Sequence, residues 1–427
     1  MSNEKRKLMW LRLDNAAKIY PASRTQQWSN VFRLSATLNE KIDCEILKTA
    51  LEKTVRRFPS IAVRLRKGLF WYYLHEIESA PEIMEEYSHP LTRMTKKETR
   101  KCAFRVIVYK DRIALEIFHS LTDGNGALVF LKTLLAEYIQ QKYNENIPCT
   151  NGVLSRDEKV KKSELEDSFL KYSGNLTQSR RENTSWQVYG TPTLGGYLNL
   201  TSFTLSSKEV LNKAHEYNVS VTTFLCAVMM KALANIKAEV DPKSKKPIKV
   251  LIPVNLRNIF ESESLRNFAL YVTPEIFPYL GEYSFEEILT AVKHKLGYEN
   301  TKKQMSMKIA TNVGSEKILI VRLMPLFIKN LVMKAVFKSV GERKSCLSLS
   351  NLGNVKVPQE LKKYIKRLDF ILGTQESSPY NCGVISFDDT MVISFIRDIK
   401  EPTLEYQFHL VLRELGLVAE VNSNMKG

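Results

Sequence analysis

The hydrophobic pattern between Ala103 and Tyr143 changes its period, and this change constrains the fold more than any other feature of the sequence. Ala103–Tyr109 and Ile113–His119 are short runs rich in β-branched and aromatic residues, and the polar turn between them predicts an antiparallel hairpin. After Asp123-Gly-Asn-Gly, apolar residues recur at helical spacing and predict a helix that ends near Tyr143. Strand, tight loop and helix therefore follow one another, which predicts a sheet covered by helices.

Strands and helices are also predicted along the rest of the chain. Apolar residues at helical spacing predict a helix over Cys44–Phe58, which Pro59 closes. Further strands are predicted at Tyr197–Leu205, Lys249–Pro253, Phe268–Phe277, Cys346–Ser350, Val384–Phe387 and Met391–Ile396, and further helices from Lys208, from Val221 and around Leu404–Leu415. Both halves of the chain are thus expected to be α+β layers.

A chain of 427 residues exceeds the usual size of one hydrophobic core, so two domains are expected. The composition turns polar and charged between Asn151 and Glu182, and we place the linker there. The expected domains are residues 1–180 and 181–427.

Charge and cysteine usage narrow the location and the partners. The N-terminus is charged without a following apolar stretch, and the six cysteines form no CxxC pair or disulfide-like spacing, which predicts a cytoplasmic protein with buried thiols. The net charge of +17 favours anionic partners, but its even spread argues against nucleic acid. Charged residues and Pro325 interrupt the apolar region Ile318–Val340, so an amphipathic helix is expected there instead of a transmembrane segment.

The search for catalytic motifs leaves one candidate. No histidine spacing suits a metal, and no phosphate loop, GxSxG elbow or dinucleotide fingerprint is present. The remaining candidate is His119-Ser-Leu-Thr-Asp123-Gly124, between the predicted strand and helix. A histidine at a strand end has few rotamers and takes a proton at neutral pH from a hydroxyl, thiol or amine.

Each residue of this candidate also has a plain structural interpretation. A histidine on an apolar face is usually a core residue, and Asp-Gly or Asn-Gly is first a turn signal. Asp123 either orients His119 or holds the loop by pairing with a buried arginine, and we favour the second role. Gly124 is expected to adopt a backbone conformation closed to other residues.

The sequence resembles the thioester-dependent acyltransferases that share an HxxxDG motif, which include chloramphenicol acetyltransferases, condensation domains and alcohol acetyltransferases. His119, Asp123 and Gly124 fill that motif. Four further segments follow the family's order, so the resemblance covers nearly the whole chain, and they are Leu13–Pro21, Phe58–Arg64, Val254–Arg257 and Ser350–Asn354. Stand-alone alcohol-acetyltransferase-like proteins look most similar, although Phe118 stands where many condensation domains carry a first histidine.

The resemblance implies two similar α+β subdomains arranged as a V around a central channel. His119 would be the general base that moves an acyl group from a thioester to an acceptor. Candidate donors to the oxyanion are Ser350 and Asn351, with the Gly124 amide as the alternative. Arg64 and Arg257 are the rival partners for Asp123.

The resemblance also implies the co-substrates. No permanently bound cofactor is expected, and the acyl donor would be acyl-coenzyme A or a phosphopantetheine thioester on an acyl carrier protein. The acceptor would be an alcohol, an amine or a lipid, and its identity stays open. A non-catalytic or carrier-docking module of the same fold is the alternative function.

Overall fold

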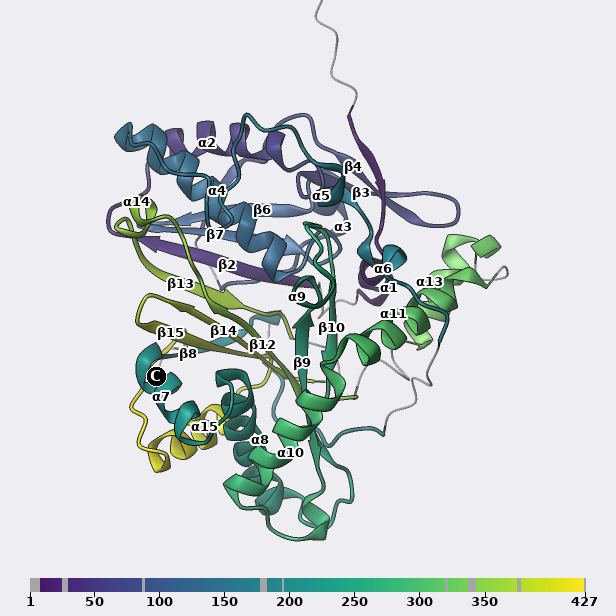
Figure 1. Ribbon diagram of the computed structural model, residues 1–427, viewed down its shortest axis with the longest axis vertical. Coiled ribbons are helices and arrows are strands. Elements are labelled where there is room, and N and C mark those ends of the chain that lie inside the picture. The colour runs from purple at the N-terminus through teal and green to yellow at the C-terminus, as the bar shows by residue number, and fades with distance from the viewer. Residues whose placement is uncertain are drawn as a thin grey trace, which may run out of the picture.

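Two sheets, each covered by helices, form the body of the protein (Figure 1). The computed structural model describes residues 8–24, 30–86, 89–176, 183–193, 196–318, 322–336, 343–374 and 378–425. Within these ranges the helices of at least ten residues are α2 (Cys44–Arg57), α4 (Gly124–Tyr143), α7 (Ser207–Glu216), α8 (Val221–Val240), α10 (Phe285–Glu299), α11 (Lys302–Lys317), α13 (Leu326–Val336) and α15 (Thr403–Glu414).

The first sheet has five strands in the order β13-β2-β7-β6-β5. Its strands are β2 (Val31–Leu38), β5 (Ile83–Glu85), β6 (Phe104–Tyr109), β7 (Arg112–Phe118) and β13 (Ile365–Ile371). Helices α2 and α4 pack together against it, and their apolar residues share one core with its strands. A separate three-stranded sheet lies beside this layer and contains β1 (Trp10–Arg12), β3 (Val63–Lys67) and β4 (Tyr72–Glu76).

The second sheet has eight strands in the order β10-β9-β12-β14-β15-β8-β16, with β11 also paired to β9. Its strands are β8 (Asn199–Ser206), β9 (Ile248–Asn255), β10 (Ala269–Val272), β11 (Glu275–Ile276), β12 (Leu347–Asn354), β14 (Tyr380–Phe387), β15 (Thr390–Arg397) and β16 (Glu420–Ser423). Helices α8, α10 and α15 supply the other side of its core. The α+β class predicted from the sequence is therefore confirmed.

Strand β13 lies in the second predicted domain, residues 181–427, but joins the sheet of the first. It belongs to the second half of the chain, yet it pairs antiparallel with β2 of the first sheet. It also packs against β14 so closely that a Cβ on Gly383 would overlap the carbonyl oxygen of Phe370. One strand thus belongs to the first sheet and touches the second, which ties the two halves together.

Most predicted elements are present, and two differ for identifiable reasons. The strand predicted over Phe268–Phe277 is divided into β10 and β11, because Pro274 between them has no N–H for a ladder. The region Ile318–Val340 is not one helix, since α13 begins only after Pro325, and residues 319–321 and 337–340 lie outside the described part. Of the helices in the described residues, α8 alone is long and apolar enough to cross a membrane, but 67% of that window is buried inside the protein.

The predicted linker, Asn151–Glu182, packs against both halves of the chain over its described part. Its Glu164 pairs with Arg57 of the first half, and its Phe169 shares a core with Phe268 of the second. It contains α5 (Lys162–Leu165) and α6 (Ser168–Lys171), and residues 177–182 lie outside the described residues. Two bonds of 2.6 and 2.8 Å join the Arg57 guanidinium at the end of α2 to the Glu164 carboxylate, and both side chains are buried. This ion pair holds the polar segment in place.

Replacing Glu164 with Ala is expected to lower the free energy of unfolding by about 3–5 kcal/mol, because Arg57 would stay buried with only the exposed Glu158, 3.6 Å away, as an acidic partner. Chemical denaturation would measure the change. The exposed pair Lys213–Glu216 gives the control, since Glu216→Ala should change stability by less than about 1 kcal/mol. Equal effects of the two substitutions would contradict the structural role of this pair.

Candidate active site

His119 lies directly after β7, at the edge of the first sheet that faces the second half of the chain. Its backbone N–H donates to Asn30 O at 2.9 Å, so the residue continues the pairing between β7 and β2. The imidazole stacks on the Tyr20 ring with centroids 4.5 Å apart, and the edge of Phe32 packs at 5.0 Å. Two aromatic rings therefore fix the plane of the imidazole.

A short chain of polar side chains fixes the remaining freedom of His119. Asn267, from the loop before β10, has its side-chain oxygen 3.1 Å from His119 Nδ1. The same amide donates through Nδ2 to Asp14 Oδ2 at 3.4 Å. With its nitrogen facing Asp14, the Asn267 amide turns its oxygen to His119, where it would accept a proton from Nδ1 of the neutral ring. The neutral ring then carries its lone pair on Nε2.

Burial lowers the pKa of His119, and the nearby Asp123 carboxylate and the contact with Asn267 only partly oppose this effect. The imidazole is therefore neutral at neutral pH, the form that accepts a proton. Burial raises the pKa of Asp14 to about 6, although Arg266 and the bonds from Ala17 and Asn267 oppose the shift.

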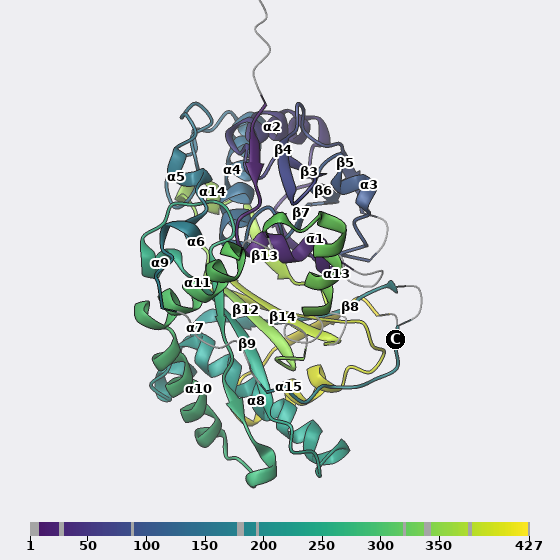
Figure 2. The same cartoon turned by 90° about the vertical axis from the view of Figure 1, so that its right-hand side faces the viewer.

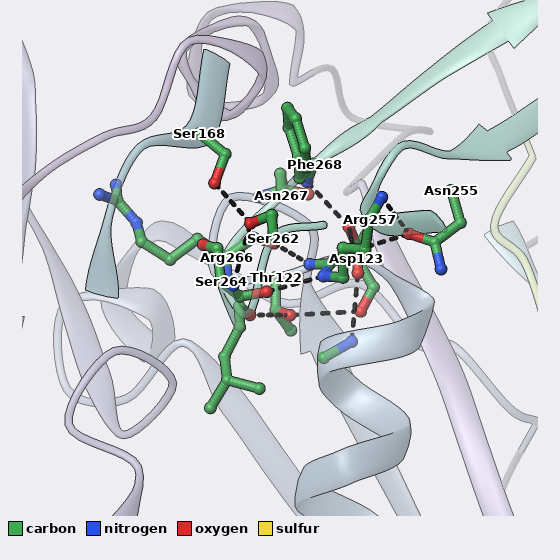
Figure 3. A network of polar contacts seen from close by, with 12 residues as sticks. Thr122, Asp123, Ser168, Asn255, Arg257, Ser262, Ser264, Arg266, Asn267 and Phe268 are labelled. Carbon is green, nitrogen blue, oxygen red and sulfur yellow. Dashed lines mark hydrogen bonds and ion pairs between the residues drawn. The ribbon is translucent and has the colours of Figure 1, made fainter. Parts of the chain in front are cut away.

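Asp123 has a structural position at the start of α4. One carboxylate oxygen accepts from Gly126 N at 3.1 Å and caps the helix. The other accepts from the Arg257 guanidinium at 2.8 Å and from Phe268 N at 2.9 Å (Figure 3). Asp123 is only 5% exposed, so both oxygens are satisfied away from bulk water. The carboxylate thus joins the motif to the second half of the chain.

Arg257, and not Arg64, is the partner of Asp123. Arg64 lies on β3, and its guanidinium contacts His75 Nδ1 at 3.2 Å. Arg257 follows β9, and its guanidinium also donates to Ser264 O at 2.7 Å and to Asn255 Oδ1 at 3.2 Å. The candidate Arg64 is therefore wrong for this role, because the three-stranded sheet holds it in a different pair.

The glycines of the motif are required for close contacts and not for an unusual backbone. Gly124 lies in the first turn of α4 with an ordinary helical backbone, so the expectation of a special conformation is wrong. A Cβ on Gly124 would come within 2.8 Å of the Leu352 side chain. A Cβ on Gly126 would overlap the Thr122 hydroxyl and the Leu265 carbonyl. Gly126 is thus the stricter requirement, since one of its neighbours is backbone.

The contact between Gly124 and Leu352 brings the oxyanion candidates beside the motif. Ser350 lies on β12 opposite Gly383 of β14 and is partly exposed. The Asn351 side chain donates to Thr222 Oγ1 at 3.1 Å and accepts from Gly353 N at 2.8 Å. Asn351 therefore holds its own loop against the start of α8, which leaves Ser350 as the freer side chain.

A pocket of about 820 Å³ opens on the second half of the chain. Its lining includes Thr222 and Ser220 at the start of α8, Asn255, and the more distant His215 and Lys293. His119 does not line it, but Thr222 bonds Asn351, and Asn255 bonds the arginine that holds Asp123. The pocket therefore adjoins the motif through the same contacts that hold the motif in place.

Among the described residues, no group of three or more His, Cys, Asp or Glu side chains is arranged to hold a metal ion. The cysteines of this part of the chain are free thiols. The acid–base chemistry available at the motif is that of His119.

Solved structures similar to this chain include an O-acetyltransferase, a protein solved with coenzyme A and a condensation domain. TRI101 from F. sporotrichioides, solved with coenzyme A and T-2, matches with a TM-score of 0.65 at 10% identity over 97% of this chain and 99% of that chain. The trichothecene 15-O-acetyltransferase TRI3 from Fusarium sporotrichioides matches with a TM-score of 0.61 at 11% identity over 97% and 96%. The first condensation domain of the CDA synthetase matches with a TM-score of 0.58 at 12% identity over 98% and 99%.

The fold is that of these solved structures, which include an O-acetyltransferase and a condensation domain. The structural matches cover both halves of the chain, which bears out the predicted fold. No protein-family model matches the sequence. No curated protein matches it either.

Three residues of the site carry no catalytic signal in the sequence. Asp14 and Tyr20 belong to Leu13–Pro21, which resembles the family's opening segment, but their contacts with Asn267 and His119 depend on how distant segments pack. Asn267 lies in a short polar loop without a motif. Only the three-dimensional fold brings it to His119.

Replacing Asp123 with Ala is expected to lower the free energy of unfolding by about 3–5 kcal/mol, because Arg257 would lose its only acidic partner in the described structure. Urea denaturation would measure the change. Arg64→Ala is the matched control, since Arg64 pairs with His75 and its loss should cost less than about 1.5 kcal/mol. A larger loss for Arg64→Ala than for Asp123→Ala would overturn the assignment.

Proposed function

We propose that the protein is an acyltransferase that moves an acyl group from a coenzyme A thioester to a hydroxyl or amine acceptor, with His119 as general base. The observation that carries the proposal is the position of His119, whose Nδ1 lies 3.1 Å from the Asn267 side-chain oxygen, so that Nε2 is the nitrogen available to accept a proton. The likeness to TRI101, solved with coenzyme A, and to TRI3, an O-acetyltransferase, supports this choice of donor and acceptor.

In the proposed reaction, His119 Nε2 takes the proton from the acceptor hydroxyl or amine as its oxygen or nitrogen attacks the thioester carbonyl carbon. A tetrahedral intermediate forms, and its collapse breaks the carbon–sulfur bond. The imidazolium then returns its proton to the departing thiolate. His119 ends the cycle neutral, and no covalent acyl-enzyme forms.

The oxyanion of the intermediate needs a fixed hydrogen-bond donor, which is worth about 3–4 kcal/mol in comparable sites. We assign this role to the Ser350 hydroxyl. Its loop lies against Gly124 through Leu352, while the amide of Asn351 is bonded to Thr222. The Gly124 amide is the alternative donor, since it lies at the start of α4, where helix N–H groups are free.

We place the donor arm in the pocket beside Thr222 and Asn255. The net charge of +17 favours a phosphate-bearing donor, and Lys293 contributes one cation to the lining. Carrier-bound thioesters present the same reacting group, so they belong in the same test as coenzyme A. In this view Asp123 and Arg257 have no chemical step, and they position the turn that carries His119.

The test is thiol release from a panel of acyl-coenzyme A and carrier-bound thioesters, measured with alcohols and amines as acceptors. Replacing His119 with Ala should reduce kcat by about 10²–10⁴-fold on a substrate the wild type uses, because the base is lost. The melting temperature should change little, since the ring is only partly buried and makes one side-chain hydrogen bond.

His215→Ala is the matched control. His215 lines the pocket but lies on α7, and no hydrogen bond of the described residues joins its side chain to the motif. It should change KM more than kcat. Full activity of His119→Ala would contradict the assigned chemistry. Absence of transfer by the wild type across the whole panel would favour a non-catalytic binding module.

A further inference from the structure

A group of exposed apolar side chains lies where the β3–β4 hairpin meets α13. Leu69 and Phe70 form the tip of the hairpin, and Leu69 is 72% exposed. Phe327 and Leu331 are one helical turn apart on α13 and are 70% and 69% exposed. Ile328 and Val332 form a parallel row on the same helix. We call these six residues the apolar tip.

Hydrogen bonds join the two segments that form the apolar tip. Leu326 N donates to Leu69 O at 2.9 Å, and Lys329 Nζ donates to Phe70 O at 2.8 Å. Lys329 Nζ also lies 3.5 Å from the centre of the Trp71 ring, and Asn330 donates to Tyr72 OH at 3.1 Å. In Figures 1 and 2, α13 lies beside α1 (Ile19–Ser23) at the margin of the molecule. The polar groups of Lys329 and Asn330 thus contact the hairpin, and the apolar side chains are left exposed to solvent.

The two segments that form the apolar tip carry basic residues and no acidic ones. Ile318–Gly341 contains four Lys or Arg and no Asp or Glu, and Val63–His75 contains three and none. Lys67, Arg322 and Lys334 are exposed beside the apolar residues. Outward apolar side chains bordered by cations are the composition of segments that lie in the interface of an anionic membrane.

We propose that the apolar tip inserts its side chains into an anionic lipid surface and holds the protein there. A second copy of the chain is disfavoured as the occupant, because two such surfaces would bring like charges together. A carrier protein is disfavoured because the tip combines a hairpin end with a helix face that projects from the body, instead of a groove that would receive a helix.

The position of the apolar tip relates it to His119. Helix α13 packs on α1, and α1 carries Tyr20, which stacks on the imidazole. A lipid surface at the tip would therefore lie next to the helix that covers the candidate base. If the proposed acyl transfer holds, long-chain acceptors dissolved in lipid are the class that this arrangement favours, and this extension alone rests on the proposed function.

The test is flotation of the full-length protein with phosphatidylcholine vesicles that contain phosphatidylglycerol, and with phosphatidylcholine vesicles alone. Binding to the anionic vesicles is expected to exceed binding to the neutral ones and to fall as salt is added, because the cations are screened. The double variant Phe327→Ser/Leu331→Ser should lower the partition coefficient by about 10–100-fold, since two apolar insertions are lost.

The matched control is Tyr279→Ser/Leu280→Ser, a pair that is 48% and 67% exposed but is followed by Glu282, Glu286 and Glu287. It should bind vesicles like the wild type. Both variants should keep the wild-type melting temperature, because the replaced side chains lie in water. His119→Ala should bind like the wild type, so this result does not depend on catalysis.

Two outcomes would overturn the proposal. One is equal binding of the wild type and Phe327→Ser/Leu331→Ser to anionic vesicles at low salt, including no binding by either. The other is an absence of vesicle binding together with a dimer, or a complex with an acyl carrier protein, in sedimentation. In that case the same double variant would dissociate the dimer or the complex.

Discussion

The ion pair between Asp123 and Arg257 is the contact on which the geometry of the candidate site depends. Asp123 belongs to the turn after β7, and Arg257 follows β9 of the other sheet. The same carboxylate caps α4 and accepts the N–H of Phe268, which adjoins Asn267. A single buried side chain thus fixes the end of one sheet, the start of one helix and the loop that reaches His119. Separating the two halves here would leave a buried charge without its partner, so the ion pair holds them in one relative position.

The consequence for chemistry is the orientation of a neutral imidazole. The loop that Asp123 holds carries Asn267, and Asn267 in turn is oriented by Asp14 from the first segment of the chain. Tyr20, from the same first segment, stacks on the ring. Three segments that are distant in sequence therefore hold the imidazole of His119. Helix α13, which presents the apolar tip, packs on the helix that carries Tyr20. The proposed acyl transfer and the proposed lipid surface concern neighbouring parts of the molecule, and each is tested separately.

The sequence predicts the local elements well because their signals are local. The hairpin of β6 and β7, the helix α4 after Asp123-Gly124 and the helix α2 before Pro59 follow from periodicity and turn residues. The sequence does not decide the roles that depend on long-range packing. Arg64 and Arg257 each end a segment that resembles the family, and only the packing of the folded chain shows that Arg257 is the partner of Asp123. Gly124 packs against Leu352, a residue more than two hundred positions away, and no local pattern contains that contact.

The central claim is that the fold holds His119 as a neutral base with its proton on Nδ1, and selective ¹⁵N-histidine NMR across a pH titration measures this directly. The His119→Ala variant assigns the signal among the six histidines. We predict a proton on Nδ1 and a pKa below the ordinary value of about 6.5, because burial disfavours the imidazolium. A proton on Nε2, or a pKa at or above the ordinary value, would contradict the account, since the ring would then lack a free acceptor at neutral pH.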